Sequence, residues 1–174
     1  HVPWIWLSLH DMIQPSFTFL VGVVLPYSIA SRKNKGASFK NILGHTIKRS
    51  FILIFLGIFL RSMHSGQTNF TFEDTLTQIG LGYTFLVIIS LYSQRVQIGA
   101  LIFILLAYAI AFALYPLPGA GFDYASTGVT ANWEHNLTGF AAHWNKNTNF
   151  AWAFDQWFMN IFPRENIFLF NKGG

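Results

Sequence analysis

The sequence predicts an all-α fold, a polytopic transmembrane helical bundle, and its composition is the first reason. Hydrophobic residues make up 52% of the 174 positions and charged residues only 10%, whereas soluble domains carry about 25% charged residues. Phenylalanine alone occurs 19 times, too often for a soluble core of this size. Uncharged runs of about membrane-spanning length also recur along the chain. We therefore expect one integral membrane domain over residues 1–174.

Four spans are expected, over residues 12–30, 41–61, 75–93 and 96–115. The first has no charge between Asp11 and Arg32. The second is unusual, because its uncharged run of 50–60 would cover only about 17 Å of a roughly 30 Å hydrocarbon core. That helix must begin near Asn41 and carry His45, Lys48 and Arg49 into or near the bilayer. The third and fourth spans are predicted to form a hairpin, and two prolines, Pro116 and Pro118, end the helical pattern.

Basic residues predict the orientation in the membrane. They gather after the first span and at the turn between the third and fourth, at Arg32, Lys33, Lys35, Lys40 and Arg95. Such residues face the cytoplasm, so the first residue and region 117–174 are expected outside, which in a bacterial inner membrane is the periplasm. All six tryptophans fall on that outer side, as in an interfacial aromatic belt: Trp4, Trp6, Trp133, Trp144, Trp152 and Trp157.

Region 117–174 reads as an outer loop followed by an amphipathic helix. Its first part is rich in Gly, Ser and Thr. Apolar residues then recur at helical spacing, at Phe150, Phe154, Trp157, Phe158, Ile161 and Phe162. Asn149 is placed to cap this helix and Pro163 to stop it. We expect it to lie on the outer membrane surface or to roof the bundle.

Several function classes are excluded by simple features. The net charge of +4 comes from basic residues between apolar runs, which is the pattern of topology signals and argues against a nucleic-acid partner. With no cysteine, the chain has no thiol nucleophile, disulfide or cysteine-bound metal. It begins without a methionine and ends without a terminating pattern. We interpret it as an internal piece of a longer protein.

Two residues at the entrance of the first span are candidates for catalysis. His1 lies three residues before Trp4, about one turn above the expected membrane boundary. An imidazole there could act as a general base or a transient acyl acceptor, and it could equally be an exposed loop residue. Asp11 stands at the start of the first helix, where capping is the simpler interpretation and organising a site is the alternative.

Lys48 and Arg49 are candidates for binding an anion from the cytoplasmic side. A charge one or two turns inside a membrane helix is costly and by default suggests function. The phosphates of a nucleotide-like cofactor would suit them. The alternative is that both side chains extend to the cytoplasmic headgroups.

The stretch around His143, Trp144 and Asn145 combines polar and aromatic side chains, a composition that suits carbohydrate and equally an ordinary outer loop. A metal site is not expected. The candidates His135 and His143, with Glu134 and Asp123, match no zinc spacing.

The opening stretch HVPWIWLSLHDMIQPSFTFLVGVVLPYSIA resembles the entry to the membrane domain of heparan-alpha-glucosaminide N-acetyltransferase and its bacterial relatives. The shared pattern is supplied without a gap by His1, Trp4, Leu7, Ser8, Asp11, Met12, Ile13, Pro15 and Phe17. Three later stretches, TIKRSFILIFLGIFL, LTQIGLGYTFLVI and HWNKNTNFAWAFDQWFMNIFPRE, resemble the bacterial branch. The likeness covers nearly the whole chain. A span that precedes the histidine in the family, and several that follow, are absent here.

The resemblance implies an enzyme that takes acetyl from cytoplasmic acetyl-CoA and delivers it to an amino sugar or glycan across the membrane. His1 would be the active-site histidine, as nucleophile or base. Arg49, and less surely Lys48, would meet the CoA phosphates. The piece alone is expected to be inactive, and the acceptor does not transfer from the family. A polytopic transporter or a non-catalytic membrane protein is the alternative, and a homo-oligomer is left open.

Overall fold

The structure, a computed structural model, confirms an all-helical fold. It describes residue 9, residues 11–130 and residues 132–170. In this described part the regular structure is all helix, with no strand. The chain divides into two compact units, residues 1–98 and 99–174.

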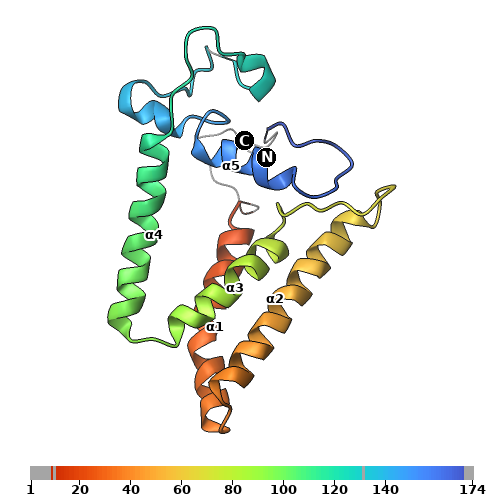
Figure 1. Ribbon diagram of the computed structural model, residues 1–174, viewed down its shortest axis with the longest axis vertical. Helices are drawn as coiled ribbons and strands as arrows, with labels where there is room; N and C mark the ends of the chain where they lie inside the picture. Colours follow the sequence, from red (N-terminus) through yellow and green to blue (C-terminus); the bar gives the residue numbers. More distant parts are fainter. Residues whose placement is uncertain (1–8, 10, 131, 171–174) are drawn as a thin grey trace. The chain divides into compact units, whose positions relative to one another are not determined.

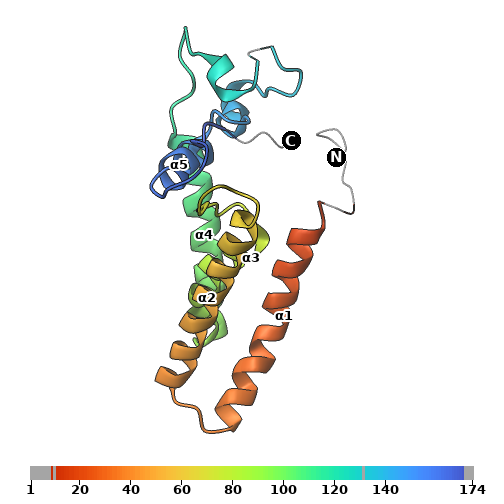
Figure 2. The same ribbon diagram turned by 90° about the vertical axis from the view of Figure 1, so that its right-hand side faces the viewer.

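The first unit contains helices α1 (Ile13–Asn34), α2 (Phe39–Ser62) and α3 (Thr75–Ser90). Helices α2 and α3 pack against each other over most of their length, whereas α1 contacts α3 over a much shorter stretch. Figure 2 shows α1 standing apart from the α2–α3 pair. The short link between α1 and α2 joins these two helices at one end of the unit (Figure 1).

Local side-chain caps explain where α2 and α3 begin. The Ser38 hydroxyl accepts a hydrogen bond from the backbone N–H of Asn41 at 3.3 Å. The Asp74 carboxylate accepts from the N–H groups of Leu76 and Thr77 at 2.9 and 3.0 Å. Both side chains thus pair backbone N–H groups that the first turn of a helix leaves without an acceptor.

The expected cap at Asp11 is wrong. The residue in the capping position of α1 is Met12, and it makes no side-chain capping hydrogen bond. Asp11 is exposed in the turn that precedes the helix. The helix therefore starts one residue later than a cap at Asp11 requires, and the carboxylate lies near the favourable end of the helix dipole.

Small residues allow α2 and α3 to approach closely. A Cβ atom added to Gly80 of α3 would lie 2.8 Å from the Ile54 side chain and 2.9 Å from the Ser50 carbonyl oxygen, both on α2. A Cβ atom added to Gly57 of α2 would lie 2.6 Å from the Asp74 carboxylate. Beside Gly80, on the side away from Gly57, the hydroxyls of Ser50 and Thr84 are 2.7 Å apart and form a hydrogen bond. This is the small-residue packing typical of membrane helices.

Helix α1 is attached to the other two helices near both of its ends. Toward the link, Leu25 and Ile29 of α1 form a buried cluster with Ile42 of α2 and Val87 of α3. At the opposite end, the Gln14 side-chain amide donates a hydrogen bond to the Gln78 side-chain oxygen on α3. The middle of α1 is therefore held beside α3 without packing tightly against it.

Helix α3 is shorter than the expected span over 75–93. It ends at Ser90 after 16 residues, or about 24 Å, against a core of roughly 30 Å. The chain turns at 91–93, and there the Gln97 side-chain amide donates to the carbonyl oxygens of Ser90 and Tyr92 at 3.4 and 3.0 Å. Helix α4 (Gln94–Leu114) then begins, and it ends before Pro116 as predicted.

The second unit comprises most of α4, two 3₁₀ helices and α5. The 3₁₀ helices are η1 (Tyr124–Thr127) and η2 (Gly139–Trp144), and α5 runs from Phe150 to Met159. The predicted cap is confirmed, because the Asn149 side-chain oxygen accepts from the N–H of Trp152 at 3.0 Å. Gly128 has a φ of 66° and lies against the Phe170 ring, so no other residue fits there.

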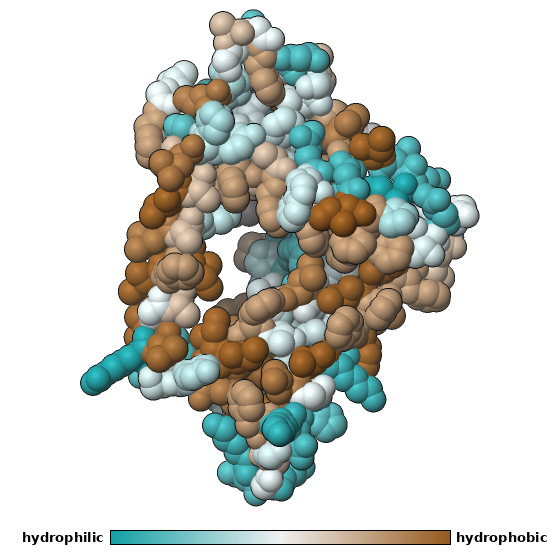
Figure 3. Space-filling view, viewed as in Figure 1, coloured by the Kyte–Doolittle hydropathy of each residue, from teal (hydrophilic) through white to brown (hydrophobic). Residues whose placement is uncertain are grey.

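The surface of the helices is that of an integral membrane protein. Three helices, α1, α2 and α4, are long and apolar enough to cross a membrane, and α3 is a shorter apolar helix. Large apolar side chains stand exposed along them, including Phe19 at 69%, Phe55 at 63% and Phe103 at 71%. Figure 3 shows this hydrophobic surface over the helices and hydrophilic residues at the end where the α1–α2 link lies. A bilayer provides the apolar surroundings that these side chains need.

We predict that Gly80→Ala destabilises the first unit, because the added methyl group overlaps the backbone of α2. Overpacking of this kind costs about 1–3 kcal/mol. Thermal unfolding in detergent measures the effect.

Gly82→Ala is the matched control, since it lies on the same helix and its Cβ would meet nothing within 4 Å. Gly82→Ala should leave the midpoint of thermal unfolding unchanged or raise it, because alanine favours a helix more than glycine does. Equal destabilisation by both variants would show that the close approach of α2 and α3 is not the cause.

Candidate functional site

The strongest candidate site lies inside the first unit, where α1, α2 and α3 meet near the α1–α2 link. Its lining combines cationic and aromatic side chains with apolar ones: Leu25, Ser28, Ile29, Arg32, Ile42, His45, Thr46, Arg49, Tyr83 and Val87. None of these lining residues is acidic. The pocket therefore carries positive charge without a carboxylate in its wall, which favours an anionic ligand.

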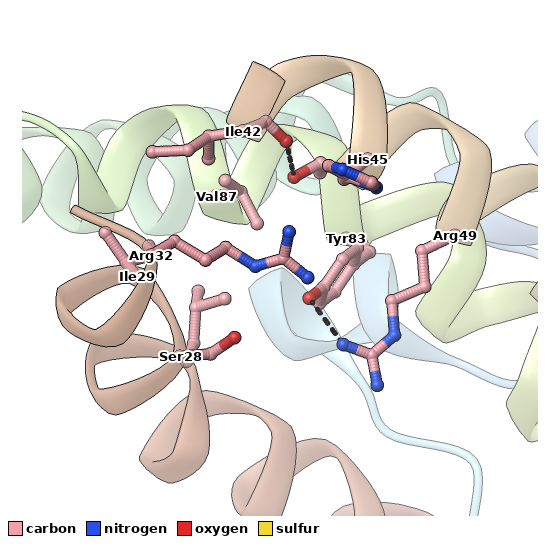
Figure 4. A pocket seen from close by; sticks show the side chains of 10 residues that line it. Ser28, Ile29, Arg32, Ile42, His45, Arg49, Tyr83 and Val87 are labelled. Carbon is pink, nitrogen blue, oxygen red and sulfur yellow. Dashed lines mark hydrogen bonds between the residues drawn. The ribbon is translucent and has the colours of Figure 1, made fainter. Parts of the chain in front are cut away.

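Tyr83 of α3 lies between the two arginines (Figure 4). Arg49 donates a hydrogen bond to the Tyr83 hydroxyl at 3.5 Å, and its guanidinium carbon lies 5.8 Å from the centroid of the tyrosine ring. Arg32 extends from the end of α1 toward the same hydroxyl from the other side (Figure 4). Two cations from different helices thus converge on one phenol, and that arrangement suits a small polydentate anion such as phosphate.

The free volume between these side chains is about 10 Å³, enough for about one water molecule. A phosphate group is larger, so Arg32 or Arg49 must turn outward to admit one. Both can do so, because Arg49 is exposed and Arg32 is only half-buried. Their guanidinium groups would then close on the anion.

A larger apolar groove of about 340 Å³ continues from this pocket between the three helices. The two spaces share Leu25, Ser28, Arg49 and Tyr83. The groove is otherwise lined by Phe17, Leu20, Val21, Val24, Leu53, Leu76 and Ile79. It follows the loosely packed middle of α1, between the Leu25 cluster and the bond from Gln14 to Gln78. A ligand with an anionic head and an uncharged arm could occupy both spaces.

The predicted cation pair is separated by the structure. Arg49 lines both the pocket and the groove, whereas Lys48 is exposed and lines neither. Adjacent residues on a helix differ by about 100° in direction, so only one of them can face α1 and α3.

Sequence reasoning missed Arg32, Tyr83 and the place of His45 in the site. In the sequence, Arg32 has the position of a topology signal, and Tyr83 lies within an apolar span. They line the same pocket as Arg49 from other helices, so no local spacing indicates their convergence. The available signal was the arginine in α2 itself, which needed a partner inside the bundle.

Of the predicted catalytic residues, only Asp11 can be compared with this pocket, and it is not among the lining residues. His1 lies outside the described residues, and Asp11 is exposed before α1.

The predicted carbohydrate-binding residues in the second unit support the loop structure. His143 Nδ1 lies 2.8 Å from the Tyr115 carbonyl oxygen and donates to it. The Asn145 side chain bonds both the N–H and the carbonyl oxygen of Leu137, at 2.8 and 3.0 Å. The Trp144 ring stacks on Phe112 of α4 with centroids 6.0 Å apart. Each of these side chains is half-buried, so part of its surface also faces outward.

Comparisons with known proteins add no relative. No protein-family model, no curated protein and no solved structure matches this chain. The class that the fold and composition define is an integral membrane protein with a helical bundle. Within the described residues, no three His, Asp or Glu side chains gather in a way that could hold a metal ion.

We predict that Tyr83→Phe weakens anion binding while preserving the fold. The ring stays against the guanidinium of Arg49, but the hydroxyl that accepts its hydrogen bond is lost. A hydrogen bond to a charged group contributes about 1.5–3 kcal/mol, and a smaller effect is expected here because the bond is long. Titration of the purified protein with pyrophosphate measures the affinity.

Tyr92→Phe is the control, because Tyr92 is exposed in the turn after α3 and lines neither space. An unchanged affinity in Tyr83→Phe would remove the tyrosine from the anion site.

Proposed function

We propose that this chain forms part of an integral membrane acyltransferase. The enzyme would take an acetyl group from acetyl-CoA on the cytoplasmic side and transfer it to an amino sugar or glycan at the opposite face. The observation that carries the proposal is the convergence of Arg32 and Arg49 on Tyr83 at the link end of the bundle. The resemblance of the opening stretch to the N-acetyltransferase family supports the choice of donor.

The depth of Arg49 supports a ligand-binding role over simple extension to the headgroups. Arg49 stands ten residues after Phe39, the first residue of α2, which is about 15 Å along the helix. A charge that far inside a membrane helix is costly. Its side chain faces Tyr83 and the groove, so phosphate would compensate its charge within the bundle.

The groove suits the acyl-bearing part of the donor. With phosphates at the arginines, the uncharged arm would run along α1 toward Phe17 and Leu76 at the far end. That path leads away from the α1–α2 link, whose basic residues predict the cytoplasmic side. His1 would act there on the acyl group, as nucleophile or as base toward the acceptor amine.

We predict that Arg49→Ala and Arg32→Ala each weaken acetyl-CoA binding by the full-length protein. Loss of a charge-assisted hydrogen bond costs about 1.5–3 kcal/mol, or roughly a tenfold to hundredfold rise in Kd. Equilibrium binding of acetyl-CoA to the protein in detergent measures the Kd.

Lys48→Ala is the matched control. It removes an equal charge one residue away, from a side chain that lines neither space. Equal weakening in Lys48→Ala would mean that the protein attracts the donor only through general positive charge.

We further predict that His1→Ala in the full-length protein abolishes acetyl transfer and leaves acetyl-CoA affinity unchanged. Transfer of radiolabelled acetyl to a glucosamine-terminated acceptor is the measurement. Retained transfer would remove His1 from catalysis. Solute flux without any acetylated product would favour the transporter alternative.

A further inference from the structure

We propose that the exposed aromatic face of α5 docks onto the outer interface of the bilayer, through apolar burial alone. The face consists of Phe150, Phe154 and Trp157 together with Ile161 in the turn that follows the helix, and it is named here the α5 stripe. Their exposed fractions are 37%, 45%, 62% and 52%. Steps of four and three residues place Phe150, Phe154 and Trp157 on one side of the helix.

The other side of α5 is already occupied by the end of the described chain. Trp152 Nε1 and the Gln156 side-chain amide both donate to the Leu169 carbonyl oxygen, at 3.0 and 2.9 Å. The Asn160 side chain bonds both backbone groups of Phe168 at 2.9 Å. Met159 is buried. The helix is thus held by one face, and the α5 stripe is the face directed away from these contacts.

Contacts with α4 set the level of α5 relative to the membrane. The Phe150 ring lies 6.1 Å from Phe112 and 6.3 Å from Tyr115, measured between centroids. These two residues belong to the last turn of α4 and the residue after it. Helix α4 is 21 residues long, or about 31 Å, which matches the roughly 30 Å hydrocarbon core. The end of α4 therefore lies at the boundary of the core, and α5 begins there.

The composition of the stripe identifies the occupant as the headgroup–acyl boundary. Tryptophan and phenylalanine are amphipathic or apolar rings that favour this layer. Exposed Phe140 in η2, at 69%, belongs to the same unit and lies against Trp144, whose ring stacks on Phe112. Ring contacts thus link α4, η2 and α5 through the buried Phe112.

The charge of α5 indicates which lipids the helix would need. Its ten residues contain one ionisable side chain, Asp155, and no lysine or arginine. Most interfacial helices carry basic residues that attract anionic lipids. Without them, docking depends on apolar area, so zwitterionic lipid suffices and salt has no effect.

The absence of cysteine from the sequence allows a direct test. Single-cysteine variants Phe154→Cys and Trp157→Cys carry a nitroxide spin label in the full chain, reconstituted into phosphatidylcholine vesicles. Collisions with oxygen, which concentrates in lipid, are compared with those of a water-soluble nickel complex. Three references are Leu106→Cys in the middle of α4, Glu134→Cys in the exposed loop, and Gln156→Cys on the opposite face. In the Gln156→Cys variant, Trp152 Nε1 still donates a hydrogen bond to the Leu169 carbonyl oxygen.

We expect labels at 154 and 157 to collide with oxygen and not with nickel, at a depth between those of 106 and 134. The collision rates of these labels with oxygen and with nickel should not change in 1 M salt or when anionic lipid is added. Nickel collisions equal to those at 134 would place the stripe in water and overturn the proposal. Protection from both reagents would show that protein covers the stripe, either the bundle or a second copy, and would overturn it equally. If a label at 106 fails to report the core, α4 does not span the membrane and the inference fails at its first step.

Discussion

The close approach of α2 and α3 is the constraint on which the first unit depends. Lipid tails are as apolar as leucine, so membrane helices gain little from burying apolar side chains against each other and associate through tight packing and hydrogen bonds. Gly80 lets the Ser50 backbone approach, and the bond between Ser50 and Thr84 lies within the same contact. Because residue 83 adjoins this contact, the packing also brings Tyr83 beside Arg49. The site is therefore a consequence of how two helices pack.

The sequence predicted the helices well, because their limits depend on local chemistry. Charge-free runs marked the apolar segments, and the prolines after α4 and the cap at Asn149 acted within a few residues of themselves. Two helix limits differ from the prediction, the end of α3 and the start of α1. Helix α3 ends at Ser90, whose carbonyl oxygen accepts a hydrogen bond from Gln97 of the next helix. Helix α1 starts without the Asp11 cap because Met12 takes the capping position.

The site was only partly predictable, since its chemistry is assembled across helices. Arg49 could be identified because a charge inside an apolar helix is costly wherever it lies. The choice between Lys48 and Arg49 required the rotation of α2 relative to its neighbours, which sequence spacing does not give. Arg32 lies at the end of α1 and reads as a topology signal in the sequence, yet its side chain extends toward Tyr83 and lines the same pocket (Figure 4). In the loop before α5, composition suggested carbohydrate for Asn145, whereas its side chain bonds the backbone of Leu137.

The charge balance of the pocket favours an anionic ligand. Two guanidinium groups near one phenol repel each other, and no acidic side chain lines the pocket to offset them. At the link end of the bundle, water and headgroups can screen Arg32. Arg49 lies deeper, where screening is weaker and the interaction with an anion is correspondingly stronger. An anion that entered from the link end would relieve the repulsion and draw α1 toward α2 and α3. The loosely packed middle of α1 is the part of the bundle that could accommodate such a movement.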